Sequence, residues 1–390
     1  MNRQIIKISI LFIFIWSVIG CKQSVIEEEI LFVKTKKYQS FPAEIILKDV
    51  DRNIEKRLFK IKDSFVYGFD WSPDGNKLIF GLTKLKETKI NNNTYSKTYV
   101  MNSKIYVMKC TNRKYTCLTD GSMEVGGPLW SPDGKKIAFY GNKNTLCKKK
   151  DSLGWFSIEN TGDIYVMDAD GKNQKKITTT STEDSNYIWT PDSKKLIFES
   201  HPNYGNKRFD ADFIKYEGNS DIYMVDSDGR NQIKLVNDPT NDRDISLSPD
   251  GRKIVYISLC NDNYEIFVMD IDSKNKIRLT NNSIDDWNPT WSPDGKKIAF
   301  TSKDCMLYLI DPDGKNQIKL TEINRNISDL ITVSSFVWAQ DSKRIAFWGS
   351  SFNDSYDIYV IDINNKEVKN LTNTPDWDEQ WISWRPIVKQ

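Results

Sequence analysis

A ten-residue motif that recurs along the chain constrains its fold more than any other feature. One complete copy, WSPDGKKIAF, occupies residues 291–300. Copies begin at positions 71, 130, 189, 247, 291 and 338, and a truncated copy, WRP, begins at position 384. Repetition at such a period indicates a repeat architecture that uses the whole length as one unit, rather than several unrelated domains.

Each full repeat carries four strand signals. The first ends at the motif Trp and is followed by a Ser-Pro-Asp-Gly turn, in which Pro presets φ and Gly tolerates positive φ. The second is the apolar half of the motif, and the third is a run such as DIYVMD at residues 163–168. The fourth is short and ends at a pair such as Leu279–Thr280. Four strands per repeat predict the blade of a β-propeller.

The ends of the chain predict how the ring closes. The segment before residue 71 supplies three strands, at residues 29–34, 44–49 and 56–60, whereas residues 381–385 supply only a first strand. Because the two fragments are complementary and closure removes exposed sheet edges, we expect them to form one blade. The predicted fold is therefore an all-β, seven-bladed propeller of four-stranded antiparallel blades. A six-bladed ring with a separate N-terminal hairpin is the alternative.

The N-terminus predicts export and a lipid anchor. Arg3 and Lys7 precede an apolar run at residues 8–19 that is short for a membrane-spanning helix. Residues 18–21, Val-Ile-Gly-Cys, resemble the bacterial lipoprotein processing box. We therefore expect residues 1–20 to be a signal peptide, Cys21 to be lipidated, residues 21–28 to form a tether and residues 29–390 to form the propeller. An ordinary secretory signal is the alternative.

These features predict a protein of the bacterial cell envelope, periplasmic or on the outer surface, held at the membrane by its lipid alone. The 55 Lys and Arg residues nearly balance the 53 Asp and Glu residues, so a nucleic-acid partner is not expected. In an oxidising compartment the favoured disulfide joins Cys110 and Cys117 across a hairpin. Cys260 and Cys305 follow equivalent strands, and Cys147 receives no role.

The motif followed by DIYVMDADGKNQKKIT, at residues 163–178, resembles the repeat of TolB-like β-propellers, a WD-repeat-like family. The resemblance extends over almost all of residues 29–386. TolB itself has a separate α/β domain before its propeller, whereas residues 22–28 alone separate Cys21 from the first expected strand. The resemblance thus implies a lipoprotein propeller without that domain and does not transfer TolB's role in the Tol system. Prolyl oligopeptidase-type enzymes have similar repeats, but the sequence contains no G-x-S-x-G nucleophile motif.

No cofactor or metal is expected from the sequence. Asp-x-Asp-Gly turns, as at Asp168 and Asp170, invite a calcium interpretation, but they lack the further acidic ligands of a calcium loop and suit a hairpin turn. Some seven-bladed relatives are lyases whose metal is held by several histidines. His201 is the sole histidine of this chain, so it cannot form such a cluster.

Three long connections between second and third strands, at residues 81–103, 141–162 and 199–220, break the regular pattern. Loops of this length are usually functional or disordered, and propeller geometry brings them to one mouth of the central tunnel. Aromatic and basic side chains on them predict a partner-binding rim. Folding back over the blade edges is the other interpretation. The rim residues are Tyr95, Tyr99, Lys148, Lys149, Lys150, Trp155, Phe156, His201, Tyr204, Phe209, Phe213 and Tyr216.

Acidic residues also recur shortly before the motif starts. A carboxylate ring at the tunnel mouth could attract a cation or a basic peptide terminus, although turn capping explains each residue singly. The residues of this predicted ring are Glu124, Asp184, Asp244, Asp286 and Glu379.

The sequence thus predicts a non-catalytic, membrane-anchored propeller that binds an envelope protein, a peptide or a glycan through its long loops. The alternative is a propeller enzyme, a lyase or a glycoside-acting hydrolase, that uses carboxylates at the tunnel mouth.

Overall fold

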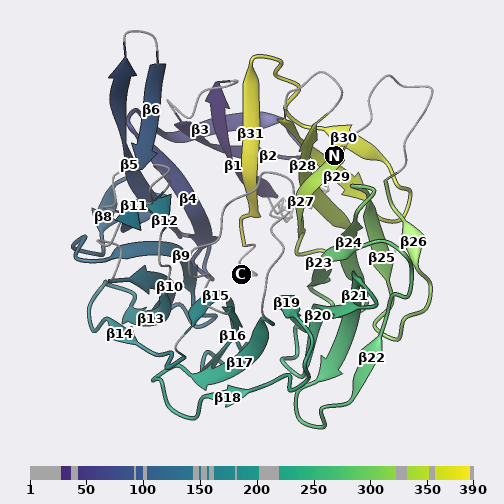
Figure 1. The fold of residues 1–390 in the computed structure, drawn as a ribbon. Helices are drawn as coiled ribbons and strands as arrows, with labels where there is room; N and C mark the ends of the chain where they lie inside the picture. The colour runs from purple at the N-terminus through teal and green to yellow at the C-terminus, as the bar shows by residue number, and fades with distance from the viewer. Residues whose placement is uncertain are drawn as a thin grey trace, which may run out of the picture.

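Seven antiparallel sheets stand as blades around a central axis in the computed structural model (Figure 1). The structure describes residues 28–36, 43–91, 94–99, 103–143, 149–150, 156–157, 162–180, 182–201, 219–321, 332–350 and 356–386. Each blade has four strands, and one blade carries an additional paired strand. The predicted seven-bladed fold is confirmed, and the six-bladed alternative is wrong. No helix in the described part of the chain is long and apolar enough to span a bilayer.

Blades 1 to 3 follow the first three motif copies. Blade 1 consists of β4 (Ser64–Trp71), β5 (Lys77–Asn91), β7 (Lys104–Lys109) and β8 (Tyr115–Cys117), with β6 (Thr94–Tyr99) paired to β5. Blade 2 consists of β9 (Glu124–Trp130), β10 (Lys136–Asn142), β13 (Asp163–Asp168) and β14 (Lys175–Lys176). Blade 3 consists of β15 (Glu183–Trp189), β16 (Lys195–His201), β17 (Asp221–Asp226) and β18 (Ile233–Lys234).

Blades 4 to 6 continue the same order. Blade 4 consists of β19 (Asp242–Leu247), β20 (Lys253–Cys260), β21 (Asn263–Asp270) and β22 (Lys276–Arg278). Blade 5 consists of β23 (Asp286–Trp291), β24 (Ile298–Ser302), β25 (Leu307–Ile310) and β26 (Ile318–Lys319). Blade 6 consists of β27 (Thr332–Trp338), β28 (Arg344–Ser350), β29 (Tyr356–Asp362) and β30 (Val368–Asn370). A short hairpin, β11 (Lys149–Lys150) with β12 (Phe156–Ser157), lies apart from the blades.

Blade 7 joins the two ends of the chain, as predicted. Its inner strand is β31 (Trp377–Trp384), which pairs antiparallel with β1 (Glu29–Lys36), and β2 (Ala43–Asp49) and β3 (Ile54–Ile61) follow outward. The backbone N–H of Arg385 donates to the Glu29 carbonyl at 2.9 Å. The Arg385 side chain donates from Nε to the Gly75 carbonyl at 2.9 Å, so it ties blade 7 to blade 1.

The repeated motif supplies core and turn. Trp130 is 4 % exposed and Phe139 is fully buried. In the intervening turn, Ser131 Oγ donates to Asp133 at 2.7 Å and accepts the Lys136 N–H at 2.9 Å, while Gly134 takes a φ of 68°. These contacts explain the motif by packing and by local hydrogen bonding.

The three long connections leave from one end of the blades. Ser64 lies opposite Lys84, Glu124 lies opposite Asn142, and Glu183 lies opposite His201. Each insertion therefore begins beside the start of its inner strand, at one mouth of the tunnel. The first insertion differs from the predicted loop, because β5 continues to Asn91 and pairs with β6 as a hairpin that projects beyond the sheet (Figure 1).

The predicted Cys110–Cys117 disulfide is wrong in this structure, where both residues are free thiols. The strand register gives the reason. Cys117 lies opposite Tyr106, which is four residues from Cys110 along the chain, or about 13 Å at the rise of a strand. A disulfide requires Cα atoms within about 7 Å. Cys260 and Cys305 are also free. Cys147, Cys21 and the predicted signal peptide lie outside the described residues.

Candidate functional site

A β-bulge occurs in the inner strand of every blade and shapes the wall of the central tunnel. The pairing of inner and second strands shifts register once in blades 1 to 6, and β31 shifts against β1 in blade 7. Bulges re-aim side chains and are frequent beside functional sites. The residue three positions before each motif start lies in the bulge or, at Ser335 in blade 6, directly after it. These residues are Gly68, Gly127, Asn186, Asp244, Asn288, Ser335 and Trp381.

Six of the seven bulge residues have positive φ. Asn186, Asp244 and Asn288 have φ values of 43°, 57° and 53°, which Asn and Asp tolerate better than most residues. Trp381 has a φ of 57° and is 46 % exposed, an unusual conformation for a bulky residue. Strained backbone that recurs at equivalent positions directs attention to the tunnel wall as a candidate site.

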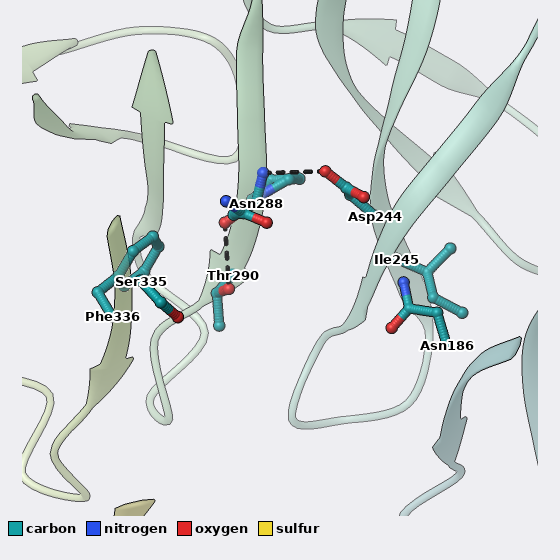
Figure 2. A pocket seen from close by; sticks show the side chains of 8 residues that line it. Asn186, Asp244, Ile245, Asn288, Thr290, Ser335 and Phe336 are labelled. Atoms are coloured by element: carbon teal, nitrogen blue, oxygen red, sulfur yellow. Dashed lines mark hydrogen bonds between the residues drawn. The ribbon is translucent and has the colours of Figure 1, made fainter. Parts of the chain in front are cut away.

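A cavity of about 210 Å³ lies against this wall, between the inner strands of blades 3 to 6 (Figure 2). Four bulge residues line it, and three of their side chains are amides or a carboxylate. We call this cavity the axial pocket. It is lined by Asn186, Asp244, Ile245, Asn288, Pro289, Thr290, Ser335 and Phe336.

Asp244 is the charged side chain among these lining residues. Its Oδ2 accepts the backbone N–H of Asn288 at 3.3 Å, so the carboxylate bridges blades 4 and 5 (Figure 2). Burial raises the pKa of Asp244, against the opposing effects of Arg243 and of the Asn288 N–H. A partly desolvated carboxylate that faces a polar cavity favours a cationic ligand.

Glu199 lies behind the axial pocket, on β16. Its side chain is 3 % exposed, and its Oε1 accepts the backbone N–H of Ile245 at 3.0 Å and the side-chain N–H of Asn186. Both donors belong to residues that line the pocket, so Glu199 ties the inner strand of blade 3 to that of blade 4. Burial and the neighbouring Asp244 raise the pKa of Glu199 to about 8.

His201, the predicted rim histidine, lies at the end of β16 in blade 3, the strand that also carries Glu199, and not on a loop. Its Nδ1 lies 2.7 Å from Ser220 Oγ, and its Nε2 lies 2.9 Å from Ser185 Oγ and 3.6 Å from Glu199 Oε2. Burial and the positive charge of Arg243 lower the pKa of His201 to about 4. The imidazole is therefore neutral at physiological pH and helps to fix β15, β16 and β17.

Three residues of the predicted acidic ring, Asp184, Asp286 and Glu379, are fully buried or nearly so. Each carboxylate accepts a hydrogen bond from the loop that leads into its inner strand, and Glu379 also forms an ion pair with Lys34 at 3.3 Å. The loop donors are Thr180 to Asp184, Asn282 to Asp286 and Thr374 to Glu379. These three side chains fasten their own blades and do not line the axial pocket.

The other two members of the predicted ring differ from these. Glu124 is half-buried at the start of β9, where burial raises its pKa. Asp244 lines the axial pocket, but the true equivalent of Asp184 in blade 4 is Asp242. The N–H groups of Asp184 and Asp242 donate to Gly162 and Ser220, which occupy matching positions. Asp244 is thus the one predicted acid that lines this pocket.

Half of the predicted rim residues lie outside the described part of the chain. Tyr95 and Tyr99 belong to β6, Lys149 and Lys150 to β11, and Phe156 to β12. The backbone of these strands is described, whereas Lys148, Trp155, Tyr204, Phe209, Phe213 and Tyr216 lie outside the described residues.

Sequence reasoning missed Asn186, Asn288, Ser335 and Glu199. The first three share one signal with Asp244, their constant position three residues before a motif start. Glu199 also had a signal, because it is a carboxylate that directly follows the apolar run Leu-Ile-Phe in the second strand, KLIFESH. Among the described residues, no group of three or more His, Cys, Asp or Glu side chains is arranged to hold a metal ion.

Solved structures of other propellers resemble this chain at low identity. TolB from Acinetobacter baumannii is 21 % identical, with a TM-score of 0.49 over 75 % of this chain and 63 % of TolB. An oligogalacturonate lyase in complex with manganese is 14 % identical, with a TM-score of 0.62 over 87 % of both chains. A puromycin-hydrolysing peptidase of Mycobacterium tuberculosis is 10 % identical, with a TM-score of 0.60 over 88 % of this chain and 51 % of the peptidase.

No protein-family model and no curated protein matches the sequence. The chain spans less than two thirds of the length of TolB and about half of the peptidase. At these identities the likeness concerns the fold alone, and it identifies the chain as a β-propeller.

Proposed function

We propose that this chain is a non-catalytic, TolB-like propeller lipoprotein of the bacterial cell envelope that binds a polypeptide partner on the long-loop face of the ring. In this proposal, a cationic group of the partner enters the tunnel and binds beside Asp244. The observation that carries the proposal is the axial pocket, whose lining combines one carboxylate with amide and hydroxyl groups and includes neither Lys nor Arg.

The chemistry of the lining favours a cation over a neutral sugar. Asn186 and Asn288 could donate to many ligands, but a partly buried carboxylate gains most from a positively charged partner. The three insertions begin at one mouth of the same tunnel, so a protein docked on the rim would have access to the pocket. The predicted rim residues would then supply the larger contact surface.

The enzyme alternative has weaker support. Catalysis by paired carboxylates requires both to reach the substrate. Asp244 lines the pocket, but Glu199 is 3 % exposed, and its Oε1 already bonds Asn186 and Ile245. Asp184, Asp286 and Glu379 are engaged within their own blades. We therefore propose a binding function.

Replacing Asp244 with Asn should weaken the binding of a cationic probe. We expect N-acetyl-L-arginine amide to bind the wild-type protein at least about tenfold more tightly than the Asp244→Asn variant, since a charge-assisted hydrogen bond contributes roughly 1.5 kcal/mol or more. Isothermal titration calorimetry measures both affinities, and N-acetyl-L-glutamine amide serves as the uncharged probe.

Asp313→Asn is the matched control, because it removes the same charge from an exposed turn outside the pocket. It should bind the arginine probe like the wild type. Equal affinities of wild type and Asp244→Asn, or equal binding of both probes, would contradict the proposed cation site.

The anchor can be tested separately in cells. We expect the wild-type protein to incorporate a labelled fatty acid and to sediment with membranes, whereas Cys21→Ser should lose the label and appear in the soluble fraction. A multiply acylated cysteine holds a protein firmly to a bilayer, because each buried CH₂ contributes about 0.8 kcal/mol. Identical labelling and fractionation of the two proteins would refute lipidation of Cys21.

A further inference from the structure

Glu199 forms hydrogen bonds with two of the residues that line the axial pocket. Its Oε1 accepts the Asn186 side-chain N–H from blade 3 and the Ile245 N–H from blade 4, at 3.0 Å for the latter. Ile245 directly follows Asp244, which lines the pocket. The carboxyl group therefore lies one residue layer behind the place where a ligand charge would lie.

The ionisable surroundings of Glu199 come from three strands, β15, β16 and β19. His201, on the same strand, lies 3.6 Å from Oε2, and β19 contributes Arg243 and Asp244. Glu183 on β15 lies opposite His201, and β17 contributes the apolar Ile222 opposite Glu199.

Two further carboxylates face away from this cluster. Asp184 and Asp221 lie opposite Ser200, and side chains alternate along a strand. They therefore point to the other face of the blade.

Arg243 stacks on the Tyr264 ring at 4.2 Å from the guanidinium carbon to the ring centroid. The positive charge of Arg243 contributes to the lowered pKa of His201 and opposes the rise in the pKa of Asp244. The His201 imidazole stays neutral and supplies no positive charge to Glu199.

Glu199 consequently holds a proton at neutral pH. Burial raises its pKa to about 8, and the charge of Asp244 adds to the rise. A cation bound beside Asp244 would cancel this second effect, because the two opposite charges offset each other at the distance of Glu199. The carboxyl group would then ionise more easily when the pocket is occupied.

We propose that the axial pocket is a proton-coupled cation site, in which the binding of a cationic group beside Asp244 expels the proton of Glu199. This inference rests on the proposed function, since it assumes that the pocket binds a cation. The O–H bond of Glu199 breaks, its electron pair stays on the carboxylate, and the proton passes to solvent. One positive charge enters the site as another leaves.

The test is calorimetric titration of N-acetyl-L-arginine amide into the full-length protein at pH 6.5 and pH 9. The guanidinium stays charged at both values, so the probe itself does not titrate. We expect about tenfold tighter binding at pH 9, the change produced by a coupling of one pKa unit. Near pH 7, titrations in two buffers with different ionisation enthalpies should reveal a net release of protons.

Two variants assign the effect to Glu199. Glu199→Gln retains an oxygen that can accept from Asn186 and Ile245, and its binding should show neither proton release nor the tenfold pH effect. Asp70→Asn is the matched control, because burial raises the pKa of Asp70 to about 7 in blade 1, away from the pocket lining. It should behave like the wild type.

Each outcome decides the proposal. Proton coupling is overturned if the wild type binds the probe equally at both pH values, or if Glu199→Gln still releases protons. Those results would leave the cation site itself in place. Failure of the wild type to bind the probe at either pH would overturn both the coupling and the proposed function.

Discussion

Removing β31 should open the ring and abolish most of the stability of the propeller. We expect deletion of residues 377–390 to lower the free energy of unfolding by about 5 kcal/mol or more, a large part of the total for an ordinary domain. The deletion removes the inner strand of blade 7, which pairs with β1 from Ile30 to Lys36. It also removes Arg385, whose side chain donates to the Gly75 carbonyl in blade 1.

Thermal unfolding followed by circular dichroism measures this effect, and deletion of residues 387–390 alone is the control. The shorter deletion spares β31 and should leave the melting temperature unchanged. Opening the ring would also expose the unpaired edge of β1, so size-exclusion chromatography should show association of the longer deletion. An unchanged melting curve for that deletion would show that blade 7 does not close the ring.

The fold was predictable because its strand signals are local and repeated. The motif Trp, the Ser-Pro-Asp-Gly turn and the apolar run after it determine where an inner strand ends and a second strand begins. Trp291 and Phe300 occupy the buried positions that this pattern predicts. The complementary strand counts at the two ends predicted blade 7, because a propeller blade is complete only with four strands.

The candidate site was less predictable because it depends on strand geometry. The sequence pattern groups Asp244 with Asp184 and Asp286, because all three are acidic residues shortly before a motif. Asp184 and Asp286 precede the bulge of their strands, whereas Asp244 lies in the bulge. Side chains on either side of a bulge change direction, so a two-residue offset moves a carboxylate from the blade interior to the tunnel wall. The contact of Glu199 with Ile245 joins residues from different blades, which no local pattern specifies.

The predicted disulfide failed for a similar reason. Cys110 and Cys117 flank a turn in the sequence, but the register of β7 and β8 decides which residues face each other. Tyr106, not Cys110, lies opposite Cys117. The β5–β6 hairpin was also missed, because its residues, such as Lys86 and Thr98, are polar and lack the alternation that marks a half-buried strand.

Replacing Glu199 with Gln should make the protein markedly more stable at alkaline pH. The pKa of Glu199 is raised from 4.5 to about 8 in the folded chain, chiefly by burial. Its stabilising contribution is therefore complete below pH 4.5 and is lost as pH rises from 4.5 to 8, because over this range the unfolded chain releases the proton that the folded chain keeps. With a side chain that is 3 % exposed, this loss amounts to roughly 4 kcal/mol at pH 8.5.

Urea unfolding at pH 4.5 and pH 8.5 measures the difference. At pH 4.5 the two proteins should have similar free energies of unfolding, because a neutral carboxyl group and an amide make similar hydrogen bonds to Asn186 and Ile245. At pH 8.5 the variant should be the more stable. Asp242 and Glu379 also have pKa values raised to about 7, so both proteins should share a remaining loss of stability with rising pH.

Glu367→Gln provides the matched control, since this glutamate is exposed in the turn before β30. Its unfolding free energy should follow that of the wild type at both pH values. Parallel pH profiles for wild type and Glu199→Gln would mean that Glu199 is already ionised in the folded protein at neutral pH. The carboxylate would then be stabilised by its two N–H donors despite burial, and Glu199 would have no proton to exchange with a ligand in the axial pocket.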